Sequence, residues 1–112
     1  MGEPGAKAGQ AADETCEQVV QDLTPLGDVT SRKMFGGYGI FNDSAMFALV
    51  NSEGDLFLKA DDTNRPRFKE VNSKQHGKMP YFQAPSEVME DSDALLDWAN
   101  ISLQIAHAAK KK

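Results

Sequence analysis

Three glycines in four positions, Gly36, Gly37 and Gly39, are the first candidates for chemistry, because glycine-rich loops can cradle phosphate groups. Such a loop places its glycines just before a helix, where backbone N–H groups and the helix dipole meet the anion. Here residues 40–50 follow instead, and they have the composition of a strand, a turn and a second strand. We therefore interpret residues 31–41 as one strand, bent or bulged at its glycines, rather than as a phosphate site.

A nucleophile paired with a base is the second chemistry to consider. Ser73 and His76 are close in sequence, but they lie in the polar segment 71–79, where no acid is placed to orient the histidine. His107 falls near the end of a helix, and Cys16 lies on an apolar helical stripe, where a buried and inert thiol is expected. One cysteine and two histidines offer no zinc-binding spacing. We expect no catalytic residue, no cofactor, no metal and no enzymatic activity.

Protein recognition is the third possibility, and five residues are candidates for it. Interfaces favour arginine and tyrosine, whose side chains combine an apolar body with a polar tip. For each candidate the alternative is structural, with Tyr38 and Phe82 in the core and Arg32 at a solvated strand end. The candidate partner-binding residues are Arg32, Lys33, Tyr38, Tyr81 and Phe82.

The composition describes one small globular domain of 112 residues, with 40% hydrophobic and 26% charged residues. No apolar run is long enough to cross a membrane and the N-terminus is not a signal peptide, so we expect a cytoplasmic protein that does not contact membranes. The net charge of −5 predicts weak or indirect binding of nucleic acid. Residues 32–78 nevertheless hold eight bases against six acids, which fits either a solvated mixed-charge face or a basic patch for an acidic partner. These features do not define an oligomeric state.

Hydrophobic periodicity predicts a disordered tail over residues 1–12 and a folded domain over residues 13–109. The expected elements are a helix starting with Asp13 or Thr15 as N-cap, strands at 31–41, 45–50 and 55–60, a helix capped by Asp61 or Asp62, a strand at 79–84, a helical turn at 86–89 and a last helix capped by Asp91. In the third strand, Leu56 and Leu58 should face one side of the sheet and Phe57 and Lys59 the other.

Six segments stand in the order of a known family: LTPLGDV at 23–29, RKMFGGYGIF at 32–41, MFAL at 46–49, LFLKAD at 56–61, MPYFQAP at 79–85 and DSDALLDWA at 91–99. Together they resemble the N-terminal domain of the TfoX/Sxy competence regulators, over about residues 14–107. The resemblance implies an α+β two-layer sandwich with an antiparallel sheet, in the order α-β-β-β-α-β-β-α, similar to secretion chaperones. Residues 71–78 are shorter than in the relatives, so the fourth strand should be short or replaced by a turn.

The resemblance also implies a function. The namesakes of the family are transcriptional co-regulators of DNA uptake that act with a cyclic-AMP receptor protein, and they carry a second, C-terminal domain. We expect a stand-alone domain here, acting as a competence-related adaptor for a protein partner such as a transcription factor. A regulatory domain that binds DNA directly but weakly is the alternative, and a small enzyme is the third interpretation.

Overall fold

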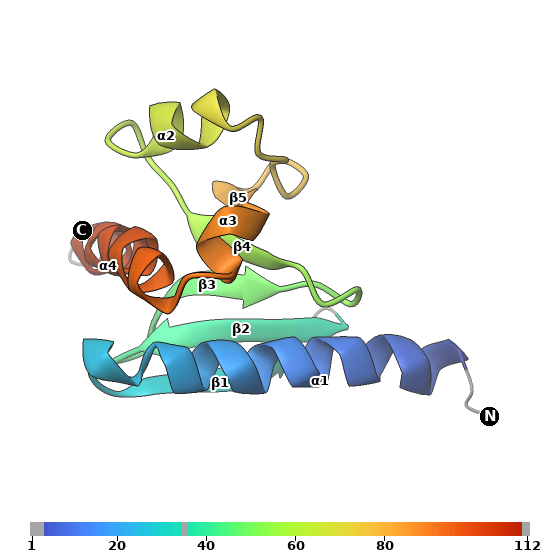
Figure 1. The fold of residues 1–112 in the computed structure, drawn as a ribbon. Helices are drawn as coiled ribbons and strands as arrows, with labels where there is room; N and C mark the ends of the chain where they lie inside the picture. Colours follow the sequence, from blue (N-terminus) through green and yellow to red (C-terminus); the bar gives the residue numbers. More distant parts are fainter. Residues whose placement is uncertain (1–3, 35, 111–112) are drawn as a thin grey trace.

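The computed structural model describes residues 4–34 and 36–110. It has the expected α+β architecture, with one antiparallel sheet of five strands in the order β1-β2-β3-β4-β5 and helices that pack against it (Figure 1). The elements are α1 (Pro4–Asp22), a 3-10 turn η1 (Thr24–Leu26), β1 (Val29–Met34), β2 (Gly37–Asn42), β3 (Ala45–Val50), β4 (Leu56–Lys59), α2 (Arg65–Glu70), β5 (Tyr81–Gln83), α3 (Ser86–Met89) and α4 (Ser92–Lys110).

The main core lies between one face of the sheet and the helices. Helices α1, α3 and α4 supply Val19, Val88 and Leu95 to this core, and all three side chains are buried. We call the covered side of the sheet the inner face and the opposite side the outer face. The inner face contributes Ile40, Phe47, Ala48, Val50, Leu56, Leu58 and Phe82.

The segment predicted as one bent strand is a hairpin of two strands, so that prediction is wrong. Met34 pairs with Gly37, which leaves a loop of two residues between β1 and β2. Phe35 lies outside the described residues, and Gly36 has a φ of 77°, the left-handed conformation that hairpin loops of this length require. Alternation of side chains could not reveal the reversal, because both strands have the same period of two.

A bulge does occur in the sheet, but not at the glycines. The register between β2 and β3 shifts between Ile40 and Phe41, so that Phe47 has no partner of its own. Phe47 and Ala48 both lie in the core as a result, although they are consecutive.

The order of elements differs from the expected one in two places. Four strands precede α2 because of the hairpin, and only β5 follows it. The fourth strand implied by the resemblance is reduced to a single bridge between Gln75 and Phe82, which agrees with the short segment at 71–78. The alternation in β4 is confirmed, since Leu56 and Leu58 join the main core while Phe57 lies in a separate cluster on the outer face.

The first helix begins earlier than its capping signals indicated. Helix α1 starts at Pro4, so Asp13 and Thr15 lie within it, and Ala12 is already part of the core. Residues 1–3 of the predicted tail lie outside the described residues, whereas residues 4–12 are helical. At the last helix, the Asp91 carboxylate accepts hydrogen bonds from the N–H groups of Asp93 and Ala94, which confirms Asp91 as the N-cap.

None of the helices in the described part of the chain combines the length and apolar character needed to span a membrane.

The hairpin generates a prediction about its glycines. A Cβ at Gly37 would lie 1.9 Å from the Val50 carbonyl oxygen, whereas a Cβ at Gly36 would meet nothing closer than 3.6 Å. We expect Gly37→Ala to lower the free energy of unfolding by about 3 kcal/mol, because the neighbouring backbone has to move. Gly36→Ala should cost about 1 kcal/mol, for its positive φ alone.

Chemical denaturation of the two variants checks this prediction, with Gly77→Ala as the control. Gly77 also has a positive φ, of 57°, and a Cβ there would have no neighbour within 4 Å. Gly77→Ala should therefore lower the free energy of unfolding by about as much as Gly36→Ala. A Gly37→Ala protein as stable as the other two variants would contradict the steric argument.

Candidate functional site

The five predicted partner-binding residues lie on both faces of the sheet. Arg32 and Tyr81 lie on the outer face, but on β1 and β5, the two outermost strands, so they do not meet. Lys33 is exposed and pairs with Tyr38, whose side chain packs against the main core. The candidates therefore do not form one patch.

Two of these candidates have structural contacts on the inner face. The Tyr38 hydroxyl donates a hydrogen bond to the Asp13 carboxylate of α1, and this bond raises the pKa of Tyr38 to about 12. Phe82 is buried and stacks on Phe68 of α2, with 5.4 Å between the ring centroids. For Tyr38 and Phe82 the structural interpretation is the one that the contacts support.

The outer face is apolar, and sequence reasoning missed most of it. Leu49, Phe57 and Tyr81 form a second buried cluster there, with Met46 and Met79 packed around them. Next to this cluster, Gly39 lies under Met34, Met46 and Phe41, whose side chains would each be within about 3 Å of a Cβ at this position. The sequence did indicate a second apolar side, because Phe57 and Lys59 alternate with the core residues Leu56 and Leu58 and must therefore face away from the main core.

Cationic side chains lie over aromatic rings at both ends of the outer face. The Arg32 guanidinium is 5.3 Å from the centroid of Phe41, and the Lys59 ammonium is 5.1 Å from that of Tyr81. The third cation of the five strands, Lys33, lies on the inner side, and the strands contain no aspartate or glutamate, in a chain with a net charge of −5. The outer face is therefore an apolar surface bordered by positive charge, which favours acidic groups.

Tyr81 is buried beneath this surface and is not one of its exposed side chains. It is 4% exposed, its hydroxyl donates a 3.2 Å hydrogen bond to the Met46 carbonyl, and burial raises the pKa of Tyr81 to about 12. The accessible side chains of the outer face are instead Arg32, which is exposed, and Met34, Phe41, Met46 and Lys59, which are half-buried.

The burial of Tyr81 generates a second prediction. Tyr81→Ala should lower the free energy of unfolding by about 3 to 5 kcal/mol, because it leaves a cavity beside Leu49 and Phe57. Tyr81→Phe keeps the packing and should cost about 1 kcal/mol, the contribution of the lost hydrogen bond. Urea denaturation measures both values, and a Tyr81→Ala protein of unchanged stability would show that the ring is not a packing residue.

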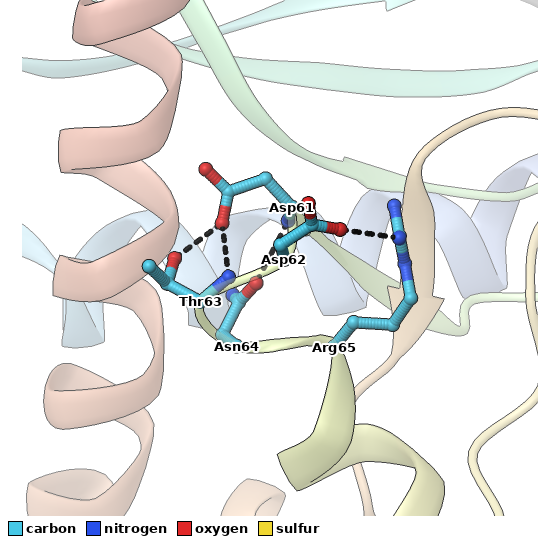
Figure 2. A network of polar contacts seen from close by, with 5 residues as sticks. All are labelled: Asp61, Asp62, Thr63, Asn64 and Arg65. Atoms are coloured by element: carbon cyan, nitrogen blue, oxygen red, sulfur yellow. Dashed lines mark hydrogen bonds and ion pairs between the residues drawn. The ribbon is translucent and has the colours of Figure 1, made fainter.

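The paired acids Asp61 and Asp62 resemble a polar site, but their contacts are structural (Figure 2). The Asp61 carboxylate accepts hydrogen bonds from the hydroxyl and the backbone N–H of Thr63. Asp62 forms a 2.9 Å ion pair with Arg65. Neither acid caps α2, which begins at Arg65 with Asn64 in the N-cap position, so the expected cap was wrong.

Asn64 connects this turn to the core. Its side-chain oxygen accepts a hydrogen bond from the Asp61 N–H, and its amide donates to the Lys59 carbonyl at 3.1 Å. The Ser102 hydroxyl of α4 donates to the same carbonyl at 2.7 Å, and both polar side chains are buried. The end of β4, the start of α2 and the middle of α4 are thus joined at one oxygen atom.

The Asp61 turn generates a prediction about pH. Hydrogen bonds from Thr63 hold the pKa of Asp61 below its ordinary value of 3.8, so the ionised carboxylate is favoured in the folded state. A lowered folded-state pKa contributes stability above the unfolded-state pKa, and this contribution is lost as the pH falls through the folded-state value. The difference in unfolding free energy between the wild type and Asp61→Asn should therefore shrink from pH 6 toward pH 3.

Denaturation curves at a series of pH values measure this difference. Asp62→Asn is the control, because its exposed ion pair should contribute little at any pH. A difference for Asp61→Asn that stays constant with pH would contradict the prediction.

The residues considered for catalysis also have structural contacts. The Ser73 N–H donates to the Phe68 carbonyl, and the His76 ring packs edge-on against Phe57 at 4.9 Å. Burial raises the pKa of the Cys16 thiol, as expected for an inert cysteine. No group of three or more metal-ligating side chains occurs among the residues that the structure describes.

Comparisons with known proteins agree with the resemblance found in the sequence. The sequence model of the TfoX N-terminal domain matches residues 21–106. A relative from Aliivibrio fischeri (strain ATCC 700601 / ES114), described as DNA transformation protein TfoX1, is 40% identical over 59 residues. The match covers 53% of this chain and 28% of the relative, so this chain corresponds to well under two thirds of that protein. The family model covers every strand from β1 to β5 and most of α4. This chain therefore belongs to the TfoX N-terminal domain family.

Proposed function

We propose that the chain is a non-enzymatic protein-interaction module, a competence-related adaptor or co-regulator that binds a protein partner such as a transcription factor. Its binding surface is the outer face, through Arg32, Met34, Phe41, Met46 and Lys59. The observation that carries this proposal is an apolar surface with a cation over an aromatic ring at each end. Methionine, aromatic residues and arginine are enriched where proteins bind one another.

The family supports the biological setting. The relative from A. fischeri is described as a DNA transformation protein, and it resembles this chain over 59 residues. A role in DNA uptake is therefore proposed for this chain by kinship, and protein binding is proposed from the chemistry of the outer face.

Direct binding of DNA is the second candidate, because the strands carry three cations and no carboxylate. Two other cations are already engaged, since Arg65 pairs with Asp62 and Arg67 with Asp97. With a net charge of −5 we expect a dissociation constant for duplex DNA no tighter than about 10 μM near physiological salt. Sub-micromolar, sequence-selective binding by the isolated chain would favour this candidate instead.

Two outer-face variants test the proposed function. Lys59→Glu reverses the charge beside Tyr81, and Met46→Glu places a carboxylate in the apolar part of the surface. Both side chains are half-buried and neither joins the main core, so we expect a folded protein with an unchanged circular dichroism spectrum. Affinity purification from the native cell with quantitative mass spectrometry should show the loss of a partner that the wild type recovers.

Lys69→Glu is the matched control, because it makes the same change of charge on the exposed surface of α2. We expect this variant to keep the partner. Folded outer-face variants that recover every partner of the wild type would place the binding surface elsewhere.

A further inference from the structure

Strand β1 leaves one edge of the sheet open. Within residues 4–34 and 36–110 it pairs with β2 and with no other segment. It is six residues long, and its residues 30–33 are all exposed. In an antiparallel sheet every second residue of an edge strand directs its N–H and C=O away from its neighbour, so β1 offers a row of backbone donors and acceptors.

The opposite edge is covered by the chain itself. The Gln83 N–H donates to the Lys74 carbonyl at 2.8 Å, and the His76 N–H donates to the Tyr81 carbonyl at 2.8 Å. Residues 74–76 therefore occupy the free side of β5. Strand addition to this sheet is possible at β1 rather than at β5.

A groove lies beside the open edge. It has a volume of about 600 Å³ and is lined mainly by α1, with Ser31 of β1 at one side. Ser31 lines it from the strand, and Cys16 lines it from the helix. On the helix side it is lined by Glu14, Glu17, Val20 and Gln21. A strand added to β1 would direct alternate side chains into this groove and the others to the outer face.

The outer face and the groove differ in charge at this edge, and this difference determines which side chains an added strand should carry on each side. On the outer face the nearest charge along β1 is Arg32, which favours an acidic side chain opposite it. In the groove, Glu14 and Glu17 disfavour a carboxylate, whereas Val20 offers an apolar contact. Lys33 is the cation on this inner side. An extended segment with acidic and apolar residues in alternation satisfies both sides.

A second copy of the chain fits the edge poorly in the two registers that centre on its cations. In an antiparallel pairing of two β1 strands centred on Arg32, the two guanidinium groups lie opposite each other. Centred on Lys33, the two lysines do so. Cationic side chains on an edge strand are a common protection against such self-pairing.

We propose that β1 is an acceptor for an added strand, and that its ligand is an extended acidic–apolar segment of another protein, with carboxylates toward Arg32 and apolar side chains in the groove beside α1. Peptide binding by strand addition uses main-chain hydrogen bonds for affinity and alternate side chains for specificity. The edge shares Arg32 with the outer face, but the backbone groups of β1 and the groove beside α1 take no part in the proposed function, so this inference goes beyond that function and can fail or succeed separately.

Synthetic peptides test the proposal by fluorescence anisotropy. The probe is a labelled peptide of about eight residues with glutamate and valine in alternation, and the control peptide has lysine in place of glutamate. We expect the wild type to bind the glutamate peptide about fivefold more tightly than the lysine peptide, and Arg32→Glu to reverse this order. Lys59→Glu should leave the order unchanged, because Lys59 lies on β4, away from the edge.

The backbone part of the proposal has its own readout. N-methylation of either the glutamates or the valines removes alternate N–H groups, and one of the two methylated peptides should lose binding. Hydrogen exchange of β1 amides should slow when the unmodified peptide is bound. Equal binding of all methylated peptides, or unchanged exchange in β1, would overturn strand addition.

Three further outcomes would also overturn the proposal. Absence of saturable binding of the glutamate peptide at about 1 mM would show that the edge is not an acceptor. A change of peptide preference in Lys59→Glu but not in Arg32→Glu would assign the peptide to the centre of the outer face, as in the proposed function. A dimer in sedimentation experiments that Arg32→Glu alters would assign the edge to a second copy of the chain.

Discussion

Much of this domain depends on the chain reversal at Gly36 and Gly37. Gly36 adopts a φ of 77°, and Gly37 approaches the Val50 carbonyl so closely that no side chain fits between them. The reversal separates Arg32 from the strand that it would otherwise share with Phe41 and places the two side by side across the hairpin. It also makes β1 the edge strand of the sheet. The position of Arg32 beside Phe41 and the open edge therefore have one cause.

The helices of the described residues cover one face of the sheet and leave the other uncovered. The inner face is buried under α1, α3 and α4, and the buried polar groups Asn64 and Ser102 tie α2 and α4 to the end of β4. The outer face has no helix over it among the described residues, and it buries Leu49, Phe57 and Tyr81 with its own neighbours and with Met79. A sheet with one apolar face packed by helices and the other partly self-covered suits a module whose ligand completes the second layer.

The separation of charge in this small protein is a further consequence of the fold. Helices and loops carry all sixteen acids of the described residues, whereas the charged residues of the strands are the cations Arg32, Lys33 and Lys59. An acidic chain thus presents a positive sheet, and a calculation of net charge alone would conceal it. At physiological salt the charge of distant acids is largely screened, so an acidic group near the sheet would be affected mainly by Arg32 and Lys59.

The sequence by itself determined the elements that depend on local chemistry. The strands at 45–50 and 56–59, the alternation of Leu56 and Phe57, the Asp91 cap and the family followed from periodicity, side-chain hydrogen bonding and motif order. Tertiary structure alone decided whether residues 31–41 bend or reverse, which tyrosine is a packing residue, and which edge stays open. A period of two is the same in one strand as in two, and the Val50 carbonyl that excludes a side chain at Gly37 is distant in sequence. Contacts between residues so distant in sequence depend on how the whole sheet packs, so a local sequence pattern cannot predict them.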